Sequence, residues 1–285
     1  MVRFGDLPVS YSTSDRSGIV IVPVPYDATS TWIRGSAKGP QAILEASVNM
    51  ELYDIETEGE VYRNGIYTDE MIVAGHSPET VISQVQGVVR NWLMQDKYVV
   101  TLGGEHSVAI GAVRAYHEKY PEMSVLQLDA HADLRPEYQG SLYNHACTMT
   151  RIKEICPVTQ AGIRSMDVQE LKYMDRDRMF FQERIHHQPD WMEKVIKTLS
   201  GQVYLTLDLD VLDPSIMPAT GTPEPGGMDW YTMLQLIRQV AEKKELVGFD
   251  VVELCPSEQN KAPDFLVAKL IYKILSYRFN LTQHE

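Results

Sequence analysis

Acidic and histidine side chains recur in three short segments of the sequence, GGEHS, DAHAD and DLDVLD. In DAHAD and DLDVLD these groups stand two residues apart, and side chains two apart in an extended chain point to the same face. The residues concerned are His106, Asp129, His131, Asp133, Asp208 and Asp210. Four carboxylates and two imidazoles, with no thiolate among them, form a donor set that could hold divalent cations.

Each of these residues has an ordinary structural explanation when taken alone. An aspartate at a strand end usually caps a helix or turns the chain, and a lone histidine is more often hydrogen-bonded in a core. That explanation is harder to apply to all six, because four neighbouring carboxylates without cations would strongly raise one another's pKa. Two divalent cations would offset their charge. Oxygen-rich ligation with imidazole suits Mn²⁺, or Co²⁺ or Fe²⁺, better than structural zinc.

Such a pair of metals could activate water. Two ions about 3.5–4 Å apart can share and acidify one water, which yields a hydroxide nucleophile near neutral pH. Other dinuclear hydrolases are excluded by missing motifs: the G-D-x-x-D-R and G-N-H-E segments of metallophosphatases and the H-x-H-x-D-H pattern of metallo-β-lactamases are absent. The phosphate-binding patterns G-x-x-x-x-G-K-[ST] and G-x-G-x-x-G are absent too.

Apolar runs that alternate with amphipathic segments position these groups. Strands are predicted at 18–25, 97–104, 124–130, 203–210 and 246–254, with a weaker one at 158–165. Helices are predicted at 229–244 and 262–279, and near 39–52, 78–95, 106–120 and 191–199. Continuously apolar strands alternating with helices indicate an α/β fold, with a mostly parallel sheet covered on both faces in a single domain spanning 1–285. Ligands of such sheets bind beyond the carboxyl ends of the strands, so we expect the three segments to meet at adjacent strand ends.

Composition limits the partners. The formal net charge is −13 and no basic block interrupts it, which argues against nucleic acid and anionic membranes. This charge favours a cationic small molecule, although it also serves solubility alone. No apolar run approaches the roughly 18 residues of a membrane span, and the N-terminus lacks the apolar region of a secretory signal, so a cytoplasmic protein is expected. The three cysteines form no C-x-x-C pair, and reduced thiols are expected.

Six motifs together resemble one family. GGEHS, DAHADLR, NHACTM, DLDVLDPS, GTPEPGG and DVVELCP, in this order and spacing, are similar to the ureohydrolases, the family of arginase and agmatinase. The likeness runs from about residue 18 to the C-terminus. It implies a three-layer α/β/α fold, a dinuclear Mn²⁺ centre that hydrolyses a guanidino group to urea, and a homotrimer or homohexamer.

The resemblance also implies residue roles. One metal would be held by His106, Asp129, Asp133 and Asp208, and the other by His131, Asp129, Asp208 and Asp210. His145, in NHACTM, matches the family histidine that shuttles protons or helps to hold the substrate, although Ala146 follows it where many relatives have glycine. Glu253, in DVVELCP, matches the glutamate that pairs with the guanidinium. Asp133 would belong to the catalytic centre as well as to the metal site.

Two further positions bear on the substrate. Arginases usually have asparagine where this chain has Arg135, and Glu224 in GTPEPGG stands where arginases tend to be apolar. Both therefore look like agmatinase, and Glu224 could sit on an acidic pocket rim or be a solvent-exposed loop carboxylate. The resemblance thus implies hydrolysis of agmatine to putrescine and urea in polyamine biosynthesis. Aminopropylagmatine, guanidinobutyrate, arginine and formiminoglutamate remain alternative substrates, and a non-catalytic relative remains an alternative from another class.

The other histidines and cysteines carry weaker signals. His117, His186 and His187 are expected to have surface or structural roles. Cys147 and Cys255 lie close in sequence to His145 and Glu253, but a packing role is favoured because neither thiol has a base of its own.

Overall fold

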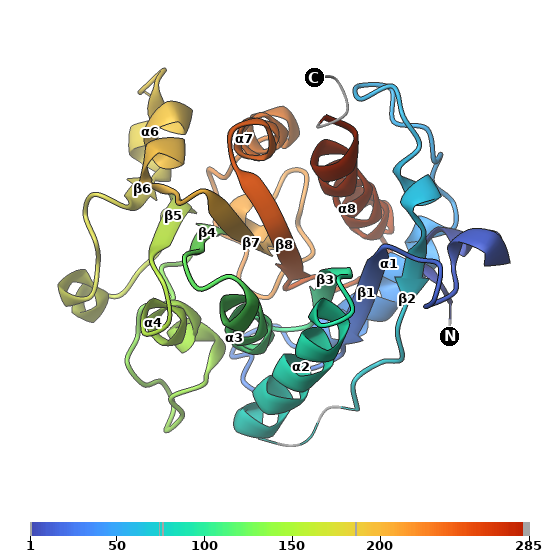
Figure 1. The fold of residues 1–285 in the computed structure, drawn as a ribbon. Coiled ribbons are helices and arrows are strands. Elements are labelled where there is room, and N and C mark those ends of the chain that lie inside the picture. The colour runs from blue at the N-terminus through green and yellow to red at the C-terminus, as the bar shows by residue number, and fades with distance from the viewer. Residues whose placement is uncertain (1, 74, 76, 186, 282–285) are drawn as a thin grey trace.

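A single sheet of eight parallel strands forms the centre of the computed structural model, which describes residues 2–73, 75, 77–185 and 187–281 (Figure 1). The strands are β1 (Ile19–Val24), β2 (Ile66–Thr68), β3 (Tyr98–Gly103), β4 (Ser124–Leu128), β5 (Val158–Ile163), β6 (Met179–Phe181), β7 (Gln202–Asp208) and β8 (Glu245–Val252). Their order across the sheet is β2-β1-β3-β8-β7-β4-β5-β6, and every pairing is parallel. The sequence had predicted a mostly parallel sheet, and this prediction is confirmed.

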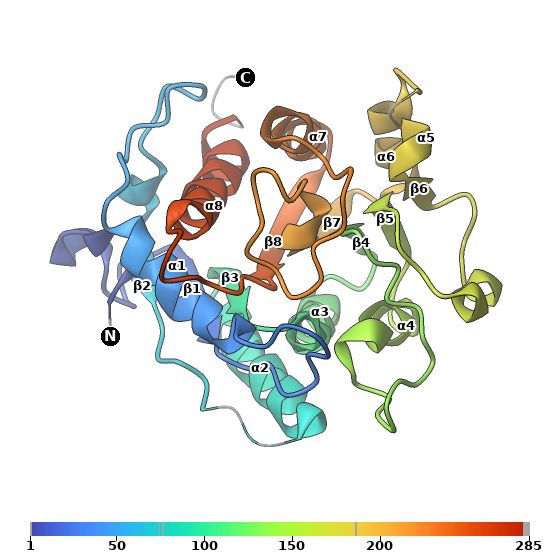
Figure 2. The ribbon, with the colours of Figure 1, turned by 180° about the vertical axis from the view of Figure 1, so that it is seen from behind.

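Helices cover both faces of the sheet, as the views from the two sides show (Figures 1 and 2). One face carries α2 (Pro78–Leu93), α3 (Ala109–Lys119) and α4 (Thr148–Lys153). The other carries α1 (Gly39–Ser47), α5 (Gln182–Ile185), α6 (Trp191–Thr198), α7 (Trp230–Lys243) and α8 (Ala262–Asn280). Two separate apolar clusters fill the space between the helices and the sheet. The expected three-layer α/β/α fold is therefore confirmed.

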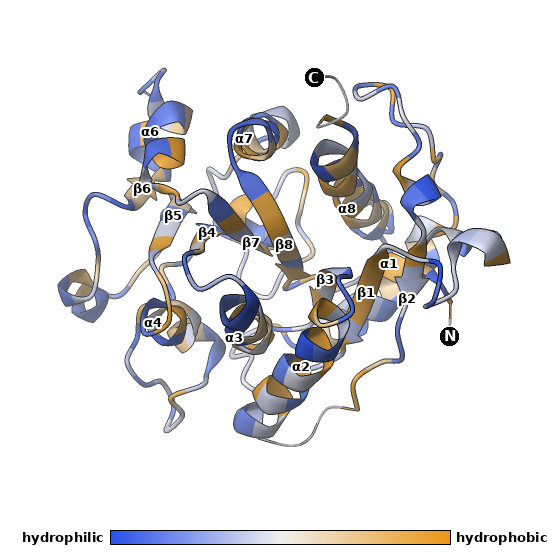
Figure 3. Cartoon of the chain, viewed as in Figure 1, coloured by the Kyte–Doolittle hydropathy of each residue, from blue (hydrophilic) through white to orange (hydrophobic). Residues whose placement is uncertain are grey.

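The local sequence explains these elements. The inner strands are buried on both faces and most of their positions are apolar, although Gln127 and Gln160 stand among them. Figure 3 shows hydrophobic stretches along the sheet and a mixture of hydrophobic and hydrophilic residues on the helices around it. α2 begins after Ser77, whose hydroxyl accepts a hydrogen bond from the Thr80 N–H. α7 begins after Asp229, whose carboxylate accepts from the N–H groups of Tyr231 and Thr232.

Two aspects of the sheet differ from the sequence prediction. The edge strands β2 and β6 were not predicted, because each has only three residues and too few positions to show a pattern. The three ligand-bearing strands were expected to be adjacent, and this is wrong: β8 lies between β3 and β7. Strand order in space depends on the crossovers, which the order of segments along the chain does not reveal. Four consecutive strands, β3-β8-β7-β4, therefore contribute to the site.

Turns and loops at the carboxyl ends of the strands complete the fold, and the long loops after β1 and β7 lie over the same region in Figure 2. Short 3₁₀ turns occur along the described chain, and some of them lie in these connections. The turns are Phe4–Asp6, Val9–Tyr11, Ser36–Lys38, Val61–Asn64, His106–Val108, His145–Cys147, Val168–Lys172 and Leu209–Val211. No helix within the described ranges is long and apolar enough to cross a membrane.

Candidate metal centre and substrate cavity

His106 follows β3 and turns one ring nitrogen toward three carboxylates. Its Nδ1 lies 3.1 Å from an oxygen of Asp129, 3.1 Å from one of Asp133 and 3.5 Å from one of Asp208. On the other side of the ring, Nε2 lies 2.9 Å from the hydroxyl of Thr206. That hydroxyl donates its only proton to Asp250 over 2.8 Å, so Nε2–H must be the donor to Thr206.

This arrangement leaves the Nδ1 lone pair of a neutral His106 facing oxygen atoms that are themselves acceptors. Nδ1 is buried and makes no hydrogen bond. A buried, unpaired acceptor among carboxylates is unfavourable unless a cation lies between them. The orphaned nitrogen therefore fits a metal ion, and the Thr206–Asp250 chain behind the ring fixes the tautomer that a metal requires.

His131 forms a second group with two carboxylates. Its Nδ1 lies 2.8 Å from Asp210 and 3.7 Å from Asp129. Asp129 thus belongs to both groups: with His106 and Asp208 it forms one set of closely spaced donor atoms, and with His131 and Asp210 it forms the other. The geometry offers two adjacent cation positions that share Asp129.

The charges of this cluster are not balanced by the protein. Among the described residues no lysine or arginine forms an ion pair with its four aspartates. Burial and the carboxylates of Asp210 and Asp133 raise the pKa of Asp129 to about 7, and burial with neighbouring carboxylates raises the pKa of Asp208 as well. Burial lowers the pKa of His131, but the adjacent carboxylates outweigh it and raise that pKa to about 10. Burial would raise the pKa of Asp210 too, but His131 outweighs it and lowers that pKa to about 2. The raised pKa values of Asp129 and Asp208 show that the protein alone disfavours four ionised carboxylates here, and bound cations would offset that charge.

Two residues of the site have backbone conformations that side chains rarely adopt. Asp133 has φ 51° and Glu253 has φ 69°. Glu253 is held there by its N–H, which donates to the carbonyl of Gly104 over 2.7 Å, and by its Oε1, which accepts from the His106 N–H over 2.8 Å. Such conformations persist only where surrounding contacts enforce them, and they concentrate at functional sites.

Buried amides and a guanidinium support the cluster, and sequence reasoning had not identified them. Gln127 donates to Asp129 over 2.6 Å and is itself held by the amide of Gln160. Arg164 donates to the backbone carbonyls of Asp210, over 2.6 Å, and Glu224, over 2.8 Å, and so ties the loop after β7 to the sheet. These contacts join residues far apart in sequence, so no local pattern could have revealed them.

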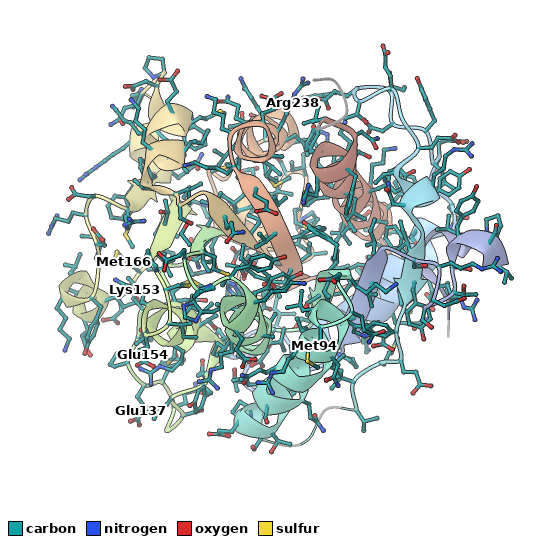
Figure 4. The ribbon with its side chains drawn as sticks, in the orientation of Figure 1. Met94, Glu137, Lys153, Glu154, Met166 and Arg238 are labelled. Carbon is teal, nitrogen blue, oxygen red and sulfur yellow. The ribbon has the colours of Figure 1, made fainter. Side chains whose placement is uncertain are left out.

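A cavity of about 300 Å³ opens beside the cluster. His145 and Glu253 line it together with the metal-facing residues, and Trp32, Tyr138, Met166 and Asp167 form more of its wall. Met166 is labelled in Figure 4. The cavity therefore joins the cation positions to a partly aromatic, partly acidic space.

Arg135 and Glu224 lie in different surroundings. Arg135 lines the cavity, where its guanidinium pairs with Asp167 over 3.3 Å and lies 4.5 Å from the centre of the Tyr138 ring. Glu224 places one oxygen 3.7 Å from Nε2 of His131, and about a third of its side chain is exposed. Glu224 therefore lies next to the imidazole of His131.

The remaining histidines and cysteines are placed as follows. His117 lies on α3 and His187 follows α5, both outside the cavity lining, while His186 lies outside the described residues. Cys147 is buried and Cys255 half-buried, and burial raises the pKa of both thiols, that of Cys147 to about 11. Neither thiol is therefore a ready nucleophile.

The chain is similar in sequence and in fold to known proteins. The arginase family model matches residues 17–276. An N(1)-aminopropylagmatine ureohydrolase of Thermus thermophilus is 37% identical over 96% of this chain and 94% of its own, and the agmatinase of Halalkalibacterium halodurans is 32% identical over 87% and 88%. The crystal structure of the agmatine ureohydrolase of Thermoplasma volcanium superposes with a TM-score of 0.90 at 30% identity, covering 100% of this chain and 97% of its own.

Proposed function

Because the chain belongs to the arginase family and is a ureohydrolase, we propose that it releases urea from agmatine or from its longer derivative aminopropylagmatine. The observation that carries this proposal is the buried, unpaired Nδ1 of His106 facing three carboxylates beside a cavity that Glu253 lines. That arrangement combines a cation position with an acidic partner for a guanidinium.

The cluster is proposed to hold two cations. His106, Asp129, Asp133 and Asp208 would hold one, and His131, Asp129, Asp208 and Asp210 the other. The donor set suits Mn²⁺, with Co²⁺ or Fe²⁺ as substitutes. When bound, the ions would supply Lewis acidity and a water of lowered pKa.

Glu253 and His145 are proposed to act on the substrate. A carboxylate matches the planar fork of a guanidinium, so Glu253 can hold the guanidino carbon next to the cation positions. Burial and the carboxylate of Glu105 raise the pKa of Glu253 to about 8, so a bound guanidinium would stabilise the ionised carboxylate that the protein alone disfavours. Burial lowers the pKa of His145, which keeps its imidazole neutral near pH 7 and able to take a proton and pass it to the departing amine.

The cavity wall favours a cationic tail. An unpaired Arg135 would attract the carboxylate of arginine or guanidinobutyrate, but its guanidinium is paired with Asp167 and lies over Tyr138. Trp32 adds an aromatic ring to the cavity lining, and aromatic rings attract ammonium groups. Agmatine fits the agmatinase-like motifs, whereas aminopropylagmatine is favoured by relatives of that name that are 35–37% identical. The amine products would be putrescine and its aminopropyl derivative, both polyamines.

A substrate panel tests the proposal. Urea release by Mn²⁺-loaded protein is measured with agmatine, aminopropylagmatine, arginine and guanidinobutyrate, and Glu253→Gln serves as the inactive control. We expect agmatine or aminopropylagmatine to have the highest kcat/KM. In Glu253→Gln, kcat/KM for that substrate should fall by about 100-fold while the metal content stays unchanged. A preference for arginine or guanidinobutyrate, or no urea from any of the four, would contradict the proposal.

A further inference from the structure

Glu105 is a fully buried carboxylate that holds a threonine from a distant loop. Its side chain is 0% exposed, and no ion pair in the described part of the chain includes it. Its Oε2 accepts from the N–H of Thr29 over 2.6 Å, and its Oε1 accepts from the Thr29 hydroxyl over 2.6 Å and from the hydroxyl of Ser107. Thr29 follows β1 and Glu105 follows β3, so these bonds fix the loop after β1 to the centre of the site.

The hydroxyl of Thr29 in turn contacts two nitrogen atoms of His145, which lines the cavity. It lies 3.0 Å from the backbone N of His145 and 3.2 Å from His145 Nδ1. The hydroxyl has one proton, which goes to Glu105, so its two lone pairs must accept from these two nitrogens. Nδ1 of His145 therefore carries a hydrogen.

The position of this hydrogen determines which nitrogen of His145 can exchange a proton with a bound substrate. With hydrogen on Nδ1, a neutral imidazole has its lone pair on Nε2, on the side of the ring away from Thr29. His145 lines the cavity, so Nε2 is the atom that can exchange a proton with a molecule bound there. An unanchored ring could rotate, or could place its hydrogen on Nε2, and would then be unable to accept.

From this geometry we propose that Thr29, held by Glu105, is a positioning residue that fixes the ring orientation and the Nδ1–H tautomer of His145. The catalytic consequence rests on the proposed ureohydrolase function. Glu105 directly precedes His106 in the chain. The same short segment therefore contributes His106 to the proposed cation site and, through Glu105 and Thr29, positions the ring of His145. His145 and the cation cluster are thereby held in a fixed position relative to each other.

Thr57 provides a matched control, because it repeats the same bonds away from the cavity. Its N–H and its hydroxyl both donate to the buried carboxylate of Asp54, over 2.9 and 3.0 Å. Thr29→Val and Thr57→Val each delete one hydroxyl that donates to a buried carboxylate and keep the shape of the side chain. The Thr57 hydroxyl also accepts from the side-chain amide of Asn280 over 3.1 Å, as the Thr29 hydroxyl accepts from His145. We expect losses of thermal stability from both substitutions, so a loss of catalysis in Thr29→Val alone would report the Thr29 hydroxyl beside His145 and not the loss of a buried hydroxyl in general.

The kinetic test compares Thr29→Val, Thr29→Ser and Thr57→Val, all loaded with Mn²⁺ and checked for metal content. We expect kcat for urea release to fall about 10- to 100-fold in Thr29→Val with KM within about twofold of the unmodified protein, because a mispositioned catalytic group slows the chemical step. Thr29→Ser keeps the hydroxyl and should restore kcat to within about threefold, whereas Thr57→Val should leave it unchanged. An unchanged kcat in Thr29→Val, or no rescue by serine, overturns the proposal.

A crystallographic test does not depend on activity. In Thr29→Val the His145 ring should rotate or leave its position, whereas in Thr29→Ser and Thr57→Val it should stay. A ring that keeps its orientation in Thr29→Val overturns the proposal even if kcat falls. If the unmodified protein hydrolyses neither agmatine nor aminopropylagmatine, the proposed function fails, and the ring orientation still decides whether Thr29 positions His145.

Discussion

Two clusters of carboxylates in this protein are neutralised in different ways. In the first, around α8, Lys273 forms ion pairs with Asp54, at 3.0 Å, and with Glu56. Glu56 also accepts from Tyr277 and from Arg238, which lies on α7 and is labelled in Figure 4. Burial would raise the pKa of Glu56, but these donors lower it to about 2. The carboxylates of this cluster are neutralised by cationic side chains of the chain itself.

The second cluster, at the strand ends, has more carboxylates and no such cation. There the pKa of Asp129 is raised to about 7. The chain surrounds these carboxylates with hydrogen-bond donors such as Gln127, and keeps lysine and arginine side chains out of ion-pairing distance in the described residues. The difference indicates that the strand-end cluster is built to receive its positive charge from outside the chain. Removing a carboxylate should therefore lower metal binding and activity in the strand-end cluster, but lower stability in the cluster around α8.

The largest expected effect follows from Asp129→Asn. Loss of the carboxylate shared by both cation positions should lower urea release by about 1,000-fold or more, because the charge stabilisation that metals supply is worth several kcal/mol. Metal content, measured on the purified protein by mass spectrometry, should fall as well. Asp54→Asn is the matched change in the other cluster, and it should lower thermal stability while metal content and activity stay within twofold. Equal metal content in the two variants would remove the distinction between the clusters.

Breaking the internally neutralised cluster should cost stability. Lys273→Met leaves Asp54 buried without its cation, and we expect the free energy of unfolding to fall by about 3 kcal/mol, as for other buried ion pairs that lose one partner. Lys269→Met, on the same helix and without a carboxylate partner among the described residues, is the control and should change stability by less than about 0.5 kcal/mol. Urea denaturation at 25 °C measures both. A similar effect of the two substitutions would show that the pair with Asp54 contributes little.

The pH dependence of stability should separate the clusters in metal-free protein. Groups with raised folded-state pKa values, Asp129 at about 7 and His131 at about 10, bind protons more tightly when folded. Their stabilisation is present below their unfolded pKa values and is lost as pH rises through the folded ones. The melting temperature of chelator-treated protein should therefore fall between pH 5.5 and 8.5. Glu56, with a pKa of about 2, is ionised in both states over this range and adds no slope.

Metal-loaded protein is the reference for that experiment. With cations bound, the aspartates are ionised at every pH in the range, so most of the decline should disappear. A parallel decline in both forms would mean that the strand-end carboxylates do not cause it.

Glu224→Gln should produce the smallest effect. Glu224 lies near His131 but is partly exposed, and solvent-screened charges contribute roughly 0.2–1 kcal/mol. We expect KM for agmatine to rise about two- to fivefold with little change in kcat. Gln235→Glu, a charge change on α7 far from the cavity lining, should leave KM unaltered. An unchanged KM in Glu224→Gln would exclude a role for this carboxylate in holding the cationic tail.

The sequence predicted the parts of the molecule that depend on local patterns. Alternating ligand types after apolar runs identified the groups that the structure brings together, such as Asp129 and His131, and the long buried strands were found within a few residues. The position of β8 between β3 and β7 was not predicted, because crossovers decide it. Nor were the partners of the site: Thr29 meets Glu105 across 76 residues, and Lys273 meets Asp54 across 219. Such contacts arise from packing and leave no periodic signal in the sequence.

The most direct test of the account is a titration of chelator-treated protein with Mn²⁺, in which bound metal and urea release from agmatine and aminopropylagmatine are measured on the same samples. The account predicts two equivalents of Mn²⁺ per chain, with urea release from at least one of these substrates increasing as the sites fill. Binding of fewer than two equivalents at saturation, or two equivalents without urea from either substrate, would contradict it.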